Sequence, residues 1–484
     1  MTDQGYSLRT SVPPLELPDF YASMSAMNKA SLVMLREAGI IPQELASRIA
    51  SGIQQLIDRE AAPDASRSHD YLNFEHALLE IVGAEGSWLH VGRSRQDMLS
   101  TGVSLWLRAA HLAFMQDLLP VREVMLELAS RNSDTVMPIY THGVQAQPTT
   151  FAHYLLAILS GLERSSARIM ESYQRTNRSP LGAGAGTTSS FAINRARLAE
   201  LLGFGAIVDN AFDANLVAPV DSSVEFVQLL ATVSVQVAQF VQDLMAQFYL
   251  TEPWLILDPA SSLTGISSMM PQKRNPRVLE VLREHASIII GSAESMTLLA
   301  HNVTSGMSDV RETVTSVVPI SRAHELLYLL LRTVRAIVVD PQRSLAEVNR
   351  DYSATTNLAE VLVQSAGVPF REAHEFASHL TDFGRQRGLK PTEIDYTQAA
   401  SVYGAALPIT AAELARALDP RHIIATREGS GGPQPREVER MRGDAADVLH
   451  EHQKWLAESQ RSVAEATTAL DAEFHKLAAL ADVA

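Results

Sequence analysis

The amino-acid sequence predicts an all-α protein of three domains, built around a central bundle of long helices. Apolar residues between Phe226 and Leu244 recur every three or four positions for about five turns, which is the spacing of one helix face. Similar helical stretches flank this segment, and no strand-like alternation of apolar and polar residues separates them. Few soluble folds need such long helices, so the middle third is expected to form a bundle.

The expected elements follow from these patterns in chain order. Before Gly92 the chain reads as short helices that prolines interrupt. Long helices are then expected at residues 105–130, 151–175, 226–244, 278–300 and 321–338. Pro120 should kink or break the first of them, and Gly and Pro clusters mark loops at the bundle ends. After Pro341 the pattern again becomes short and interrupted. The predicted domains are therefore residues 1–92, 93–343 and 344–484.

Composition and charge exclude several functional classes. The 484 residues carry 40 Lys and Arg against 55 Asp and Glu, a formal charge of −15, which argues against nucleic acid as the main partner. The absence of cysteine excludes disulfides, thiolate metal sites and thiol nucleophiles, and it fits a cytoplasmic protein. The start of the chain lacks the pattern of a secretion signal. The apolar stretch from Phe226 to Gln242 contains glutamines and is short for a bilayer span, so we expect a buried helix and no membrane anchor.

One segment, Ser267 to Pro276 (SSMMPQKRNP), gathers two hydroxyls, a lysine, an arginine and an amide on a proline-bounded loop. Lysine and arginine attract carboxylate or phosphate groups, and asparagine donates hydrogen bonds. The loop is therefore a candidate anion site. Taken alone, a solvated polar turn explains the same residues.

Two further segments carry polar groups of the same kind. His90 to Asp97 places Arg and Ser at an expected helix start, where free N–H groups favour anions, but an ordinary helix cap explains it better on composition alone. Thr141 to Thr150 places a histidine among amides and hydroxyls, and a lone histidine is more often structural than catalytic. Only the joint order of the three segments points to a shared site.

With these three segments in this order, the sequence resembles the aspartase and fumarase superfamily. The signature loop of that superfamily, SSxMPxKxN, matches Ser267 to Asn275 at every fixed position. Within the superfamily it is most similar to argininosuccinate lyases. Their GRSRND, THLQxAQP and SPLGxGA segments resemble three segments here, namely Gly92 to Asp97, Thr141 to Pro148 and Ser179 to Ala185.

The resemblance implies a reaction and a role for each matching residue. Family members remove a proton beside a carboxylate, hold the carbanion as an aci-carboxylate, and expel an amine or hydroxide to leave fumarate. Ser267 would be the base, and Lys273 and Asn275 would stabilise the aci-carboxylate. His142 and Glu280 match the family's paired histidine and glutamate. The substrate-binding residues would be Ser94, Arg95, Gln96, Thr141, Gln147 and Ser268. The resemblance also implies a small dicarboxylate substrate, no cofactor or metal, and a homotetramer in which three subunits build each site.

The sequence departs from the family mainly where the amine half of the substrate binds. Val224 replaces an Arg used at the guanidino end, and the family's DLQEDKE segment is not recognisable in residues 304–314. Gly143 and Val144 replace a Leu-Gln pair, Gln96 replaces an Asn, and Arg9 is only a weak match for the Arg of the usual WGGRF opening. We therefore expect a carbon–nitrogen lyase whose amine is not arginine.

Two alternatives remain open: a genuine argininosuccinate lyase with rebuilt guanidino contacts, and an inactive lyase fold kept as a structural protein. Other motifs are set aside. His374 and His379 are five residues apart and would not share a helix face, so a zinc site is not expected. The GxGxG of Gly182 to Gly186 has no expected strand before it, which argues against a dinucleotide site. His450 and His452 read as solvated charge on a helix.

Overall fold

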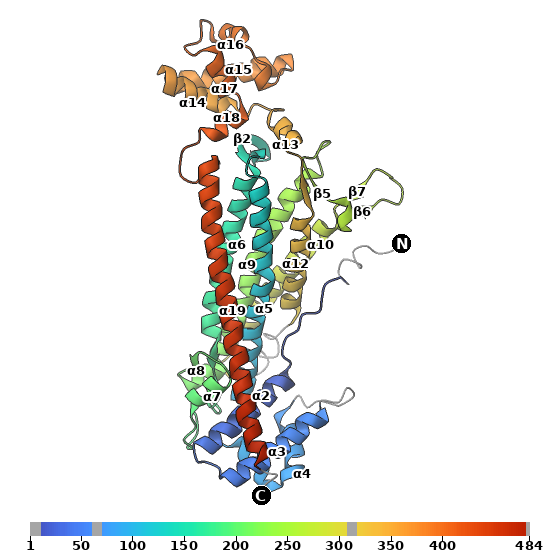
Figure 1. Cartoon of the computed structure of the whole chain (residues 1–484), viewed down its shortest axis with the longest axis vertical. Coiled ribbons are helices and arrows are strands. Elements are labelled where there is room, and N and C mark those ends of the chain that lie inside the picture. The colour runs from blue at the N-terminus through green and yellow to red at the C-terminus, as the bar shows by residue number, and fades with distance from the viewer. Residues whose placement is uncertain (1–10, 61–69, 307–316, 481–484) are drawn as a thin grey trace.

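The computed structural model describes residues 11–60, 70–306 and 317–480. It confirms the all-α class: long helices run side by side along an elongated bundle, with smaller groups of helices at its two ends (Figure 1).

The lower end in Figure 1 is built from the first helices of the chain. They are α2 (Phe20–Glu37), α3 (Gln43–Glu60), α4 (Tyr71–Val82) and the 3-10 helix η1 (Ala84–His90). Their apolar side chains form one buried cluster with α7 (Arg195–Leu201). Leu470, Phe474 and Leu477 near the end of the chain complete this cluster, so segments far apart in sequence share one core.

The centre holds six long helices whose apolar faces make the largest buried cluster. They are α5 (Arg95–Arg131), α6 (Phe151–Thr176), α9 (Ala218–Gln247), α10 (Arg277–Ala300), α12 (Val317–Arg335) and α19 (Pro435–Ala479). The predicted long helices are thus confirmed, and α5 continues through Pro120 without a break. The predicted helix at 321–338 is too long, because β8 (Ile337–Val339) pairs with β5 (Leu255–Leu257).

Helix α9 contains the apolar stretch that the sequence assigned to a buried helix. Among the described helices it is the one long and apolar enough to cross a bilayer by composition. In the structure it packs between α6 and α10, with Phe226, Leu230 and Phe240 fully buried. The prediction of a buried core helix is confirmed.

Short strands join the helices, and the sequence did not predict them. The longest pair is an antiparallel hairpin of β1 (Val136–Thr141) and β2 (Val144–Thr150). β3 (Arg178–Ser179) runs parallel to β4 (Ala206–Ile207), just before α8 (Ala211–Leu216). β6 (Gly265–Ile266) pairs with β7 (Arg274–Asn275), and another 3-10 turn, η2 (Pro259–Ser261), precedes them. These pairs fix the loops that connect the long helices.

The upper end in Figure 1 is a separate group of short helices with its own apolar cluster. They are α14 (Thr355–Ala366), α15 (Phe370–Arg387), η3 (Pro391–Glu393), α16 (Tyr396–Tyr403), α17 (Ala411–Ala417) and α18 (Pro420–Ala425). α13 (Pro341–Val348) precedes them and packs on β1, in a separate small cluster with Val136 and Ile424. α19 then runs back along the bundle against α5 and α6 to α2 and α3. His374 and His379 are exposed on α15.

One histidine assignment was wrong. His452 on α19 is buried, and its Nδ1 accepts a hydrogen bond of 2.8 Å from Arg122 on α5. The same guanidinium donates to Ser166 on α6, so the pair ties three helices together. Burial and the neighbouring Arg122 lower the pKa of His452 to about 4, which keeps the ring neutral.

Candidate active site

The first predicted segment forms the start of helix α5. Ser94 caps the helix through a hydrogen bond from the Gln96 N–H to its hydroxyl, and Asp97 accepts the Ser94 N–H in return at 2.8 Å. This reciprocal cap is the ordinary structural explanation that the sequence offered, and the structure bears it out. Ser94 and Gln96 are half-buried. Arg95 is exposed and forms an ion pair with Asp70 at 2.6 Å.

Asp97 was not among the predicted site residues, yet it organises this end of the bundle. Its carboxylate is fully buried and accepts the N–H groups of Gly182 (2.9 Å) and Gly184 (3.1 Å). Burial raises its pKa to about 6, while the hydrogen bonds from the backbone N–H groups act in the opposite direction. The signal for Asp97 in the sequence is its place three residues after the Ser94 cap.

The N–H groups of Gly182 and Gly184 therefore bind the Asp97 carboxylate of the same chain. Gly182 and Gly184 have φ of 85° and 60°, and a Cβ on Gly184 would lie 2.8 Å from the Thr188 carbonyl oxygen. The two-residue strand β3 precedes these glycines, so the expectation that no strand precedes them was wrong. These hydrogen bonds to Asp97 attach the Ser179 to Ala185 stretch to the start of α5.

The second predicted segment is the tip of the β1–β2 hairpin. His142 and Gly143 form its two-residue turn with φ of 55° and 76°, which is the pattern of a type I′ turn. Thr141, His142 and Val144 are exposed, and the Val144 side chain is 61% accessible. Gln147 is half-buried on β2. The hairpin thus holds His142 at an exposed turn.

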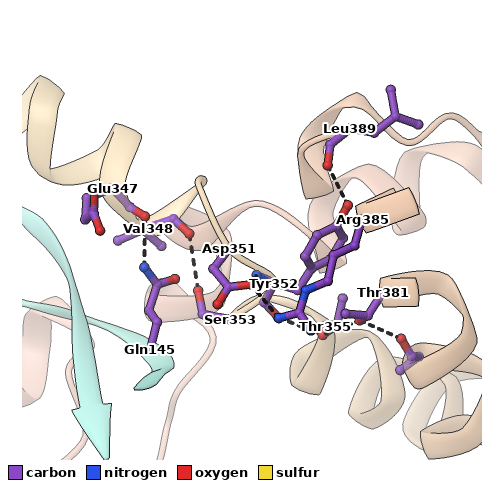
Figure 2. A network of polar contacts seen from close by, with 11 residues as sticks. Gln145, Glu347, Val348, Asp351, Tyr352, Ser353, Thr355, Thr381, Arg385 and Leu389 are labelled. Carbon is purple, nitrogen blue, oxygen red and sulfur yellow. Dashed lines mark hydrogen bonds and ion pairs between the residues drawn. The ribbon is translucent and has the colours of Figure 1, made fainter. Parts of the chain in front are cut away.

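Hydrogen bonds fasten this hairpin to the helices at the upper end of the bundle. The Gln145 amide donates to the Glu347 carbonyl oxygen on α13 at 2.9 Å (Figure 2). The Tyr140 hydroxyl also contacts the Glu347 carboxylate. Past α13 the Ser353 hydroxyl donates to the Val348 carbonyl oxygen, and Arg385 donates to Asp351 (Figure 2). Gln145 was not predicted as a site residue, because its contact with α13 spans about two hundred positions of sequence.

The third predicted segment is the loop between β6 and β7, which projects from the side of the bundle (Figure 1). The Ser267 hydroxyl oxygen accepts the N–H groups of Met269 (3.3 Å) and Met270 (3.0 Å). Donors aimed at this oxygen would favour its alkoxide over its neutral form. The backbone of the loop therefore provides chemistry that a serine base needs.

The remaining residues of the third segment lie around this serine. Ser268 and Lys273 are exposed and Asn275 is half-buried on β7. Two apolar side chains of the loop are also open to solvent, Ile266 at 70% and Met269 at 80% accessibility. Glu280 lies in the first turn of α10, and within the described chain it pairs with Arg277 and not with His142.

A single subunit does not bring the three segments together. The start of α5 and the hairpin that follows it lie at opposite ends of a helix of 37 residues, or about 55 Å. The 267–275 loop lies toward the hairpin end, as Figure 1 shows. Two predicted features, Arg9 and the stretch from 307 to 314, lie outside the described residues.

Comparison with known proteins identifies the family. A family model described as Lyase matches residues 19–291, and one described as Argininosuccinate lyase C-terminal matches residues 352–425. The argininosuccinate lyase of Methanoculleus marisnigri is 32% identical over 480 residues, covering 96% of each chain.

Solved structures agree with this relationship. EDDS lyase in complex with formate superposes with a TM-score of 0.88 at 27% identity, covering 99% of this chain and 96% of that one. A variant of EDDS lyase with bound fumarate gives 0.87 at the same identity and coverage. The chain therefore belongs to the argininosuccinate lyase family of the aspartase and fumarase superfamily, and it is a carbon–nitrogen lyase that releases fumarate.

Proposed function

We propose that this lyase eliminates an amine other than arginine from an N-substituted aspartate. The observation that carries the proposal is a contrast within the chain: the 267–275 loop keeps every fixed residue of the signature, while Val224 stands where the family has its amine-side Arg. Val224 is half-buried on α9, and the next residue, Glu225, is already paired with Arg175. The similarity to EDDS lyase also supports an amine that is not arginine.

The predicted residues divide the chemistry between them. Ser267 takes the proton from the carbon beside a carboxylate, and the electron pair moves onto that carboxylate. Lys273 and Asn275 hold the resulting aci-carboxylate, since donors placed where charge develops give the largest stabilisation. The C–N bond then breaks, the electron pair forms the double bond of fumarate, and the amine leaves with a proton. His142 and Glu280 assist this proton transfer.

The second carboxylate of the substrate would be bound by Ser94, Arg95, Gln96, Thr141, Gln147 and Ser268. No cofactor or metal takes part in this scheme, and a cytoplasmic location stays a prediction from composition.

Assembly follows from the separation of the segments. Because about 55 Å of α5 separates the 94–97 segment from the hairpin, one site needs these segments from different subunits. A homotetramer, with three subunits at each site, meets this requirement. The open side chains of Ile266 on β6 and Met269 on the 267–275 loop fit burial against a partner subunit.

The test is the reverse reaction. Fumarate is incubated with a panel of amines that includes arginine, loss of its ultraviolet absorbance is followed, and adducts are identified by mass. An adduct with a non-arginine amine supports the proposal, and an adduct with arginine alone identifies a genuine argininosuccinate lyase. No adduct with any amine favours the inactive fold.

A substitution tests the assigned base. Ser267→Ala should lower turnover by about 10²- to 10⁴-fold, as loss of a general base does. Ser401→Ala, at an exposed serine on α16, is the control and should leave turnover unchanged. Turnover of Ser267→Ala close to wild type would show that another group removes the proton.

A further inference from the structure

A cavity of about 470 Å³ lies behind the hairpin that carries His142, and the scheme above does not use it. Its walls come from β1, the start of α6, the end of α9, the segment leading into β5, and α13. This volume falls within the usual range of sites for small molecules. Gly143 of the turn also lines it, so the cavity reaches the residue next to His142.

The cavity contains polar groups that the fold leaves unsatisfied. Gln247 is 7% exposed and its Oε1 has no hydrogen-bond partner among the described residues. Trp254 is 3% exposed, and its Nε1–H is likewise unpartnered in the described chain. Both residues line the cavity. A buried acceptor without a partner costs about 1–3 kcal/mol, so the Gln247 oxygen points to a bound molecule that donates a hydrogen bond to it.

The charge of the lining selects the class of that molecule. Among the described residues that form the walls there are two carboxylates, Asp243 and Glu347, and no lysine or arginine. Glu347 already lies 3.4 Å from Arg350, whereas Asp243 is at the exposed mouth and bonds only to the Tyr154 hydroxyl in the described chain. Asp243 therefore has no basic partner among the described residues, and the Tyr154 hydroxyl counteracts the rise in its pKa that burial causes.

The position of Asp243 and Gln247 defines a site for a cation. The two residues are one turn apart on α9, so their acceptor oxygens lie on the same helix face. Aromatic walls from Phe151, Tyr154 and Trp254 adjoin them, and aromatic faces attract cations as well as apolar groups. The arrangement suits an ammonium group at the mouth and an apolar body inside.

We propose that this cavity is a second binding site, for a small protonated amine with an apolar body. The ammonium group donates to Asp243 and Gln247, and the apolar body lies against Phe151, Leu244 and Leu250. The site is distinct from the 267–275 loop. A bound amine would contact both the hairpin and α13, which Gln145 joins.

The test measures binding to the intact protein, without turnover. Benzylamine, protonated at pH 7.5, is titrated by calorimetry and by the fluorescence of Trp254, with a Trp254→Phe variant to assign the signal. Benzyl alcohol has the same shape without the charge and should bind at least about fivefold more weakly. Equal binding of the two ligands, or no binding of the amine, would overturn the proposal.

Matched variants locate the bound amine. Gln247→Leu and Asp243→Asn should each weaken benzylamine binding at least about fivefold, while Gln242→Leu, at an exposed glutamine on the same helix, should not. Ser267→Ala should also leave binding unchanged, which separates this cavity from the catalytic loop. Benzylamine that binds Gln247→Leu as tightly as wild type lies elsewhere, and the assignment would then be wrong. Should Gln247→Leu fail to fold, Asp243→Asn at the exposed mouth tests the same assignment, because unchanged benzylamine binding to that variant would equally place the amine elsewhere.

Discussion

Asp97→Asn is predicted to remove a pH dependence from the stability of the protein. The pKa of Asp97 is raised to about 6 in the fold from 3.8 in the unfolded chain because the carboxyl is buried. Between these values the folded state binds more protons than the unfolded state, so the free energy of unfolding falls as pH rises. The difference between the two pKa values corresponds to about 3 kcal/mol in the free energy of unfolding. This contribution is fully present below pH 3.8 and is lost above pH 6.

Asp97→Asn removes the cost of burying an ionised carboxylate, but it leaves a backbone N–H group without an acceptor. An amide has one oxygen and an NH2 group that cannot accept, so it cannot accept the Ser94 N–H and the two glycine N–H groups together, whereas a carboxyl group offers two oxygens whether ionised or protonated. At least one buried N–H is left unpaired, at a cost of about 1–3 kcal/mol. At pH 7 the variant no longer buries an ionised carboxylate, and this gain offsets the lost hydrogen bond. Its free energy of unfolding should therefore be close to that of the wild type. At pH 4 it should be less stable by up to about 3 kcal/mol.

The assay is urea unfolding at pH 4, 5, 6 and 7, at one fixed protein concentration because the proposed subunit association would contribute to stability. The wild-type profile alone does not isolate Asp97, because burial lowers the pKa of His111 to about 4 and this favours folding as pH rises. The difference between variant and wild type cancels that contribution. Asp447→Asn, at an exposed carboxylate on α19, is the control. A difference that stays constant with pH, or is largest at pH 7, would refute the reasoning.

Three further predictions concern the hairpin and the helix contacts. Gly143→Val should lower the melting temperature through a cost of about 1–2 kcal/mol, because its φ of 76° disfavours a branched side chain, while Gly143→Asn should cost less. Gln145→Leu, which loses the bond to Glu347, should lower kcat about tenfold with little change in KM, and an unchanged kcat would dismiss Gln145 as a positioning residue. Arg122→Met should raise the pKa of His452, read by NMR of labelled histidines, since a neighbouring positive charge is removed; a lower pKa would contradict this.

Sequence patterns predicted the long helices well because those helices are amphipathic over many turns. The spacing from Phe226 to Leu244 identified a helix that the structure extends over Ala218–Gln247. Patterns of period two were too short to identify strands: β8 has three residues, and its pairing with β5 depends on a contact about eighty positions away. The helix predicted at 321–338 therefore ended too late.

The same distinction applies to the candidate site. Residue types and their order selected the 94–97, 141–148 and 267–275 segments, because anion binding needs particular side chains. Asp97 and Gln145 were missed because their functions depend on distant backbone groups, the Gly182 and Gly184 N–H groups and the Glu347 carbonyl oxygen. His452 was misread as solvated because only the packing of α19 on α5 shows that Arg122 lies beside it.

Under the proposed function, the separation of the segments would allow the amine to change while the chemistry is kept. Val144 lies on the hairpin at one end of the bundle, and Val224 lies near the start of α9, which begins at the other end. Neither belongs to the 267–275 loop that we assign to the carbanion. A substitution at Val224 would therefore alter contacts to the amine half of the substrate without disturbing the donors around Ser267. In the proposed homotetramer each such substitution would occur in every site, because the subunits are identical.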